Sequence, residues 1–256
     1  MPFTVSAVAV LTYVLLHLPL VVLVAFSFNR SRFGVQWGGF TLDWYARLVS
    51  RPDILRALRL SLAVGTLSTL LATLMGTLAA LALSRHRPRV RRAAEAVLYL
   101  PIVTPEVIAG VSLLVLFSWL GMVLGITTIV IAHTAFSIPF VTVVVLARLQ
   151  GNDRTLEEAA MSLGADELST FRRVTLPLLM PGVLAGALLA FTLSFDDFVT
   201  TFFVSGVGST TLPLAVYSMV RKSVEPTINA LSALLVAVTT IAVYFADRLA
   251  RGSARA

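Results

Sequence analysis

Six long apolar runs constrain the fold of this chain more than any other feature of its sequence. A transmembrane helix needs about 20 consecutive, largely apolar residues. Inside lipid, every backbone N–H and C=O group must be paired within the protein, which favours helices. The sequence therefore predicts an all-α, polytopic membrane protein of one domain with six transmembrane helices. The predicted spans cover residues 5–28, 60–83, 96–117, 125–147, 178–198 and 228–246.

The composition excludes several other classes of protein. Charged residues make up 13% of the 256 residues, whereas a soluble domain carries about 25%. The chain has no cysteine, so disulfide bonds and thiolate metal sites are excluded. A net charge of +7 could indicate nucleic-acid binding, but the basic residues mostly flank the apolar runs instead of forming one face. We therefore expect a lipid bilayer around the chain and no nucleic-acid partner.

The basic residues also predict the orientation in the membrane. The loop 84–92 holds five arginines within nine residues, and short basic loops stay in the cytoplasm. Because successive loops alternate sides, residues 148–177 and the tail with Arg248, Arg251 and Arg255 are predicted to be cytoplasmic as well. These three segments contain 12 of the 20 basic residues.

The loop 148–177 has the pattern of a helical hairpin. Thr155 can cap a short helix, with Glu158 at the capping-box spacing three residues further on. Gly164 suits the left-handed position that ends such a helix. A second short helix follows, and Pro177 opens the next span. A hairpin of this kind, with small residues, can insert into the groove of a partner protein.

The order of residues in this hairpin resembles the EAA loop of ABC importer permeases, the MetI-like family. The motif reads Glu158-Ala159-Ala160, three residues, Gly164, nine residues, Val174, one residue and Leu176-Pro177. Only the valine departs from the family pattern, which usually has isoleucine there. The resemblance implies the type I ABC importer permease fold and a loop that docks into a cleft on the ATP-binding subunit. The docking residues that it implies are Glu158, Ala159, Ala160, Gly164, Glu167, Leu176 and Pro177.

The chain has no nucleotide-binding loop of its own. The sequence Gly-x-x-x-x-Gly-Lys-Ser/Thr, which cradles phosphates, is absent, and the one lysine, Lys222, lacks the upstream glycines. We therefore expect ATP hydrolysis on a separate chain, with no catalytic residue, cofactor or metal site in this one. The alternatives are an ion-coupled secondary transporter, which would have no use for the hairpin, and a membrane enzyme, which would need a catalytic constellation.

An acidic residue in the third apolar run marks a functional candidate, because acids are costly inside a membrane. Thr104 as an N-cap, Pro105 at the first helical position and Glu106 in the first turn form a helix start. The helix is therefore predicted to break and restart at membrane depth, which is tolerated where the backbone lines a cavity. In the alternative, Glu106 only complements the helix dipole.

Two adjacent acids, Asp196 and Asp197, lie at the outer end of the fifth run. Neighbouring residues on a helix point about 100° apart, so we expect one carboxylate to face the transport path and the other a neighbouring helix or the outer surface. In the alternative, both mark the water-exposed end of the span. Acids at two places favour a cationic substrate.

An isolated histidine in the fourth run, His133, is expected to hydrogen-bond to a neighbouring helix.

Four further segments resemble the spermidine/putrescine branch of the same family, at residues 33–37, 40–45, 191–197 and 212–219. The resemblance implies a multi-pass protein of a prokaryotic inner (plasma) membrane. Its partners would be a second homologous permease, a dimer of ATP-binding subunits and a periplasmic or extracellular substrate-binding protein. The alternative substrate is another small solute, such as an amino-phosphonate or an opine.

The resemblance also implies where the substrate passes. The family's substrate-path positions fall on Trp44, Glu106, Ser194, Asp196 and Asp197. Carboxylates pair with ammonium groups, and the face of a tryptophan attracts a cation. Trp44 can equally anchor a span at the membrane interface. Gly182 and Gly186 have the spacing of closely packed helices, either within this chain or against the partner permease.

Overall fold

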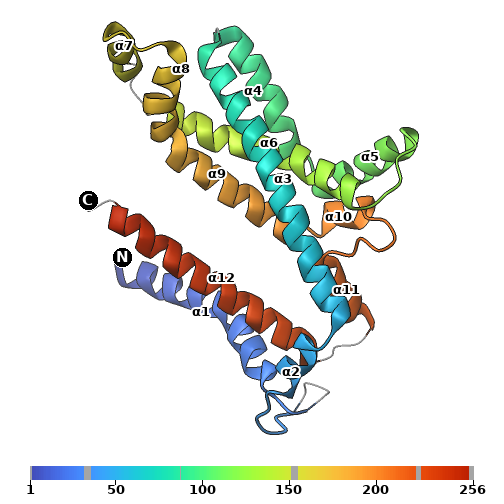
Figure 1. Cartoon of the computed structure of the whole chain (residues 1–256). Coiled ribbons are helices and arrows are strands. Elements are labelled where there is room, and N and C mark those ends of the chain that lie inside the picture. The colour runs from blue at the N-terminus through green and yellow to red at the C-terminus, as the bar shows by residue number, and fades with distance from the viewer. Residues whose placement is uncertain (1, 32–35, 87, 151–154, 223–225, 254–256) are drawn as a thin grey trace. The chain divides into compact units, whose positions relative to one another are not determined.

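The structure, a computed structural model, describes residues 2–31, 36–86, 88–150, 155–222 and 226–253. Within these ranges the chain is almost entirely helical (Figure 1), and its β pairing is a single bridge between Asn29 and Phe40. The all-α prediction is therefore confirmed. Four parts of the sequence analysis lie outside the described residues, namely residues 33–35, Arg87, residues 151–154 and Arg255. The side chains of Arg248 and Arg251 are also not described.

The bounds of the helices are as follows. They are α1 (Pro2–Ser27), α2 (Asp43–Val49), α3 (Pro52–Arg85), α4 (Pro88–Val103), α5 (Glu106–Trp119), α6 (Ile126–Gln150), α7 (Thr155–Ser162), α8 (Glu167–Thr170), the π-helical turn η1 (Phe171–Thr175), α9 (Leu176–Asp196), α10 (Val199–Val204), α11 (Leu212–Lys222) and α12 (Pro226–Ser253).

The predicted spans correspond to apolar helices of this set. Four helical stretches are long and apolar enough to cross a bilayer, and a bent pair of helices makes a fifth. The four are Val5–Ser27, Pro52–Arg85, Ile126–Gln150 and Glu167–Asp196. The sixth predicted span lies in α12, whose described apolar part, Pro226–Ile241, is shorter. The chain is thus a polytopic helical membrane protein.

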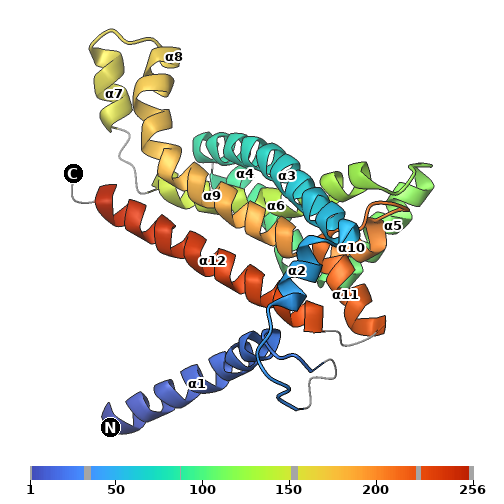
Figure 2. The same ribbon diagram turned by 60° about the horizontal axis from the view of Figure 1, so that its bottom comes forward.

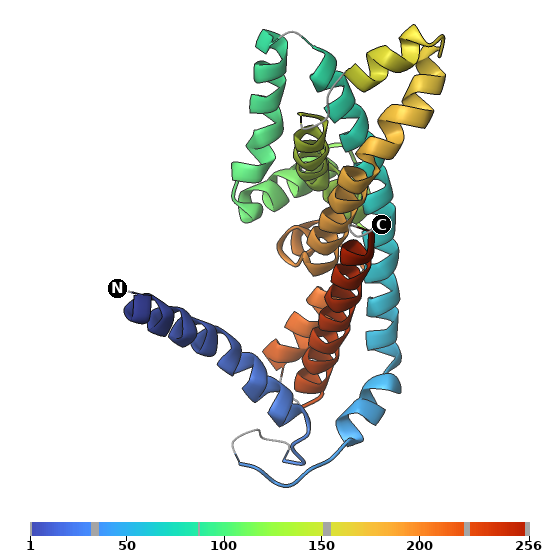
Figure 3. The same cartoon turned by 90° about the vertical axis from the view of Figure 1, so that its left-hand side faces the viewer.

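The third predicted span is the bent pair. Arg91–Val103 and Glu106–Trp119 meet at 101° (Figure 3), so the predicted break before Glu106 is confirmed. The assignment of Thr104 as the N-cap was wrong, because its hydroxyl donates to the carbonyl of Leu100 at 2.6 Å and so stays with α4. Pro105 occupies the cap position. A proline disfavours helical backbone in the residue before it, which ends α4 at this point.

The chain divides into two compact units. One contains residues 1–56 and 215–256, where α12 packs against α1 and α2. The other contains residues 57–214, where α6 packs against α4, α9 and α10, and α10 packs against α5. The second unit holds the hairpin and four of the five residues expected along the substrate path.

Glycines allow the helices of the second unit to approach α6 closely. A Cβ atom on Gly76 of α3 would lie 2.8 Å from the Cβ of Val141, and one on Gly186 of α9 would lie 3.2 Å from the Cγ1 of the same valine. Val141 is completely buried between them. A Cβ on Gly182 would meet Arg148, also on α6, at 2.8 Å. Gly182 and Gly186 therefore pack within this chain.

The loop after α6 forms the predicted hairpin, with one difference. Gly164 lies in the turn directly after α7, and its φ of +92° is the left-handed conformation that glycine adopts without strain. The second helix does not end before the next span, because α8, η1 and α9 form one continuous helix (Figure 2). A proline ring in a regular α-helix clashes with the carbonyl four residues earlier. For Pro177 that carbonyl belongs to Arg173, inside the wider π-helical turn.

Replacing Gly76 by alanine tests the packing around Val141. Helix propensity alone favours alanine over glycine by about 1 kcal/mol, whereas overpacking costs about 1–3 kcal/mol. We expect Gly76→Ala to lower the thermal unfolding midpoint of the purified protein. Gly125→Ala is the matched control, because a Cβ there would meet nothing within 4 Å. Equal midpoints for the two variants would contradict the close approach of α3 to α6.

Candidate functional site

The hairpin of α7 and α8 presents its surface outward. None of the residues in α7 is buried, and Leu163 at its end is 90% exposed. Glu158 and Ala159 are exposed and Ala160 is half-buried. Nothing lies within 4 Å of a Cβ placed on Gly164. The glycine is therefore required by its backbone conformation and not by a close contact.

Two carboxylates fix the hairpin internally. Glu157 accepts a hydrogen bond from the hydroxyl of Thr175 at 2.6 Å, which ties α7 to the π-helical turn before α9. Asp166 accepts one from the backbone N–H of Ser169 at 3.1 Å and so caps α8. Hydrogen bonds from the side chain and the backbone of Ser169 lower the pKa of the Asp166 carboxyl from its ordinary value. The shape of the hairpin is thus set by its own residues.

A charged recess of about 510 Å³ lies between the hairpin and the adjoining ends of α3, α4, α6 and α9. Its lining includes Arg85 and Arg91 together with Glu157, Glu158 and Glu167. The structure therefore brings together the two acids, Glu158 and Glu167, that were expected to contact the ATP-binding subunit. A recess with charges of both signs suits a hydrophilic partner and does not suit lipid acyl chains.

Trp44 holds the loop that follows α1 in the first unit. Its indole N–H donates to the carbonyl of Asn29 at 2.7 Å, and the side chain is 9% exposed. The Asn29 side chain in turn accepts from the N–H groups of Ser31 and Gly38. The guanidinium of Arg47 lies 5.0 Å from the centre of the tryptophan ring. The ring that was expected to attract a substrate cation therefore already has a cation over it.

Glu106 and Asp196 are exposed acids that lie outside the hairpin of the second unit. Glu106 occupies the first turn of α5, directly after the bend, and Asp196 is the last residue of α9. Among the described residues, neither carboxylate has a hydrogen-bond or ion-pair partner.

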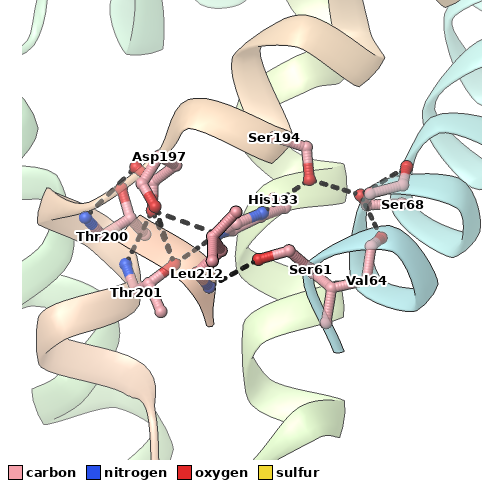
Figure 4. Close-up of polar contacts among 10 residues, drawn as sticks. Ser61, Val64, Ser68, His133, Ser194, Asp197, Thr200, Thr201 and Leu212 are labelled. Carbon is pink, nitrogen blue, oxygen red and sulfur yellow. Dashed lines mark hydrogen bonds and ion pairs between the residues drawn. The ribbon is translucent and has the colours of Figure 1, made fainter. Parts of the chain in front are cut away.

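Ser194 and Asp197 belong instead to a buried polar cluster around His133 (Figure 4). One imidazole nitrogen, Nδ1, lies 2.7 Å from the Ser194 hydroxyl, which lies 2.9 Å from the hydroxyl of Ser68 on α3. The other, Nε2, lies 3.1 Å from Asp197 Oδ2 and 3.0 Å from the hydroxyl of Thr201. The cluster joins α3, α6, α9 and α10.

Sequence reasoning found only part of this cluster. His133 was expected to bond to a neighbouring helix, which is confirmed, but its partners were not identified. Ser68 and Thr201 carried no sequence signal, since serine and threonine are common in apolar helices. The one available signal was an ionisable histidine inside an apolar run together with acids in another run, because buried charges are paired in membranes.

Replacing Trp44 by phenylalanine separates its two interactions. Phenylalanine keeps an aromatic face for a cation but loses the N–H group, which leaves the buried carbonyl of Asn29 without its donor at a cost of about 1–3 kcal/mol. We expect Trp44→Phe to make residues 28–45 more sensitive to limited proteolysis in the purified protein. Arg47→Gln, which removes the cation but not the hydrogen bond, is the control and should leave the cleavage rate unchanged. Unaltered proteolysis of Trp44→Phe would contradict the anchoring role.

Comparison with known proteins places this architecture in a family. The family described as "binding-protein-dependent transport system inner membrane component" matches residues 72–255. The spermidine/putrescine transport system permease protein PotC of Escherichia coli is 42% identical over 239 residues, which are 93% of this chain and 90% of that protein. The putrescine transport system permease protein PotI of the same organism is 41% identical over 246 residues, covering 93% of this chain and 88% of that protein.

A solved structure has the same fold. A chain of a bacterial ABC transporter involved in the import of the acidic polysaccharide alginate matches with a TM-score of 0.77 at 18% identity, over 97% of this chain and 94% of that chain. The ABC importer permease fold expected from the hairpin motif is thereby confirmed, as is the resemblance to the spermidine/putrescine permeases. The chain belongs to the family of binding-protein-dependent transport system inner membrane components and is a multi-pass permease protein of the inner membrane.

Proposed function

We propose that this chain forms half of the path by which a polyamine, spermidine or putrescine, crosses the membrane. The observation that carries the proposal is the identity of 42% to a spermidine/putrescine permease over nine-tenths of both chains. The exposed carboxylates of Glu106 and Asp196 support it, because each lies at the end of an apolar helix where a carboxylate can pair with an ammonium group. They suit an amine better than an anionic solute.

The partners follow from the family and from the hairpin. A second homologous permease would complete the path, and a substrate-binding protein would deliver the polyamine on the outer side. ATP would be hydrolysed by a dimer of ATP-binding subunits, so the permease itself is no enzyme. The hairpin with Glu158, Gly164 and Glu167 is the contact we propose for an ATP-binding subunit, on the cytoplasmic side. The exposed Leu163 would insert into that subunit's cleft as an apolar contact.

The docking proposal predicts which substitutions break the complex. We expect Gly164→Asp to abolish co-purification of the ATP-binding subunit, because a side chain at a φ of +92° strains the end of α7 and adds a charge at the contact. Glu158→Lys reverses a charge in the recess and should have the same effect. The measurement is the ratio of the two subunits after affinity purification.

A matched control is available at another glycine. Gly121 also has a positive φ, of +67°, and a Cβ there would meet nothing within 4 Å, but it lies between α5 and α6 and not in the hairpin. Gly121→Asp should leave the subunit ratio unchanged. If Gly164→Asp and Glu158→Lys both assembled and transported like the unaltered protein, the docking role of the hairpin would be refuted.

The substrate proposal is tested on the assembled transporter. ATPase activity is measured with the cognate binding protein in the presence and absence of spermidine or putrescine. We expect stimulation by the binding protein loaded with polyamine and not by the unloaded binding protein. Stimulation by an amino-phosphonate or an opine, with none by either polyamine, would reject the substrate but keep the transporter assignment.

A further inference from the structure

We propose that the adjacent acids Asp196 and Asp197 have separate roles, with His133 as a positioning residue for the second. Asp196 presents its carboxylate to the transported cation, whereas Asp197 is held by His133 and fixes the turn from α9 into α10. The inference rests on the proposed polyamine transport for the role of Asp196. The role of His133 rests on the geometry of the buried cluster alone.

The carboxylate of Asp197 is surrounded by donors from the protein. Oδ1 accepts from the N–H of Thr200 at 3.2 Å, and Oδ2 accepts from the N–H and the hydroxyl of Thr201, both at 2.8 Å. The His133 Nε2 contact, at 3.1 Å, makes a fourth donor. A carboxylate offers about four acceptor positions. Three of these donors meet at Oδ2 and one at Oδ1, and the side chain is 10% exposed, so Asp197 is far less accessible to an ammonium group of a substrate than Asp196.

With the hydrogen of the His133 imidazole on Nε2, both ring nitrogens have a partner in the cluster. The N–H at Nε2 of His133 donates to Asp197, and Nδ1 accepts the proton of the Ser194 hydroxyl. The Ser194 oxygen also lies 2.9 Å from that of Ser68, whose hydroxyl donates to the carbonyl of Val64 at 2.7 Å. Each group in this chain of contacts has a partner, and His133 is 2% exposed. The histidine therefore links α3 and α9 on one side to the start of α10 on the other.

The position of α10 matters because it packs against the helix that carries Glu106. A Cβ on Gly110 of α5 would lie 2.7 Å from the ring of Phe203 on α10, so the two helices are in close contact one turn after Glu106. At its other end, α10 is tied to α6 by the hydroxyl of Thr128, which donates to the carbonyl of Val204 at 2.8 Å. Loss of the His133–Asp197 contact would therefore disturb the turn from α9 into α10 and the seating of α10 against α5 and α6.

The two roles predict different kinetic defects in the assembled transporter. Asp196→Asn should raise the KM for uptake roughly tenfold, since it removes a charge that pairs with the substrate. Its effect should be larger for spermidine than for putrescine, which has one ammonium group fewer. Asp197→Asn should lower the maximal rate roughly tenfold and change KM by less than about threefold, equally for both polyamines. Similar KM defects in the two variants would overturn the separation of roles.

A double-mutant cycle tests the positioning role of His133. Because His133 and Asp197 act as one unit, the double variant His133→Leu/Asp197→Asn should have a maximal rate no lower than that of the less active single variant. His133→Gln, which keeps an N–H group for Asp197 but carries no charge, should restore most of the maximal rate that His133→Leu loses. Independent, multiplying defects in the cycle, or failure of His133→Gln to restore the rate, would overturn the proposal. If Asp197→Asn yields no complex, Thr201→Val takes its place in the cycle.

The cycle remains decisive if the substrate proposal fails. If the unaltered transporter took up neither spermidine nor putrescine, both would be rejected as substrates, and the role of Asp196 would be rejected with them. The coupling of His133 to Asp197 is then measured in the basal ATPase rate and the thermal unfolding midpoint of the purified complex, neither of which needs a substrate. Additive effects on both quantities would reject the positioning role independently.

Discussion

The pairing of backbone polar groups inside a membrane is the constraint on which the rest of this structure depends. A continuous helix satisfies it, but each break releases N–H and C=O groups that need another partner. The break after α4 places Pro105, which has no N–H group, at the start of α5. The break after α9 is satisfied by Asp197, which accepts from the N–H groups of Thr200 and Thr201. At the first break the proline removes an N–H group that would need a partner, and at the second the aspartate carboxylate supplies the acceptors.

The same constraint separates the acids into two kinds. Asp197 is largely buried, and its carboxylate is hydrogen-bonded within the protein. A carboxylate in that position is stable only because donors from α6 and α10 converge on it. Glu106 and Asp196 are exposed at the two breaks and have no such donors among the described residues. These two acids are the ones that we propose for contact with the transported cation. The breaks in the helices and the candidate cation-binding acids therefore have a common origin.

Sequence reasoning predicted the apolar helices, the break before Glu106 and the hairpin, because each depends on residues close together in the chain. It could not decide between Asp196 and Asp197, because that depends on His133, more than 60 residues away. It also assigned the cap before α5 to Thr104, since local patterns do not reveal that this hydroxyl bonds backwards to Leu100. The bend of 101° is likewise a tertiary property, because Pro105 ends a helix without setting the direction of the next one.

The continuity of α8, η1 and α9 suggests how the hairpin can influence the acids at the other end of the unit. A helix of 30 residues joins Glu167 to Asp196, and at 1.5 Å per residue it is about 45 Å long. The glycines of α9 bring this helix close to α6, and the His133 cluster holds its far end. A force applied at the hairpin therefore acts on a continuous helix and not on a loop. A partner that moves the hairpin would shift Asp196 together with the turn into α10, since both lie at the end of the same helix.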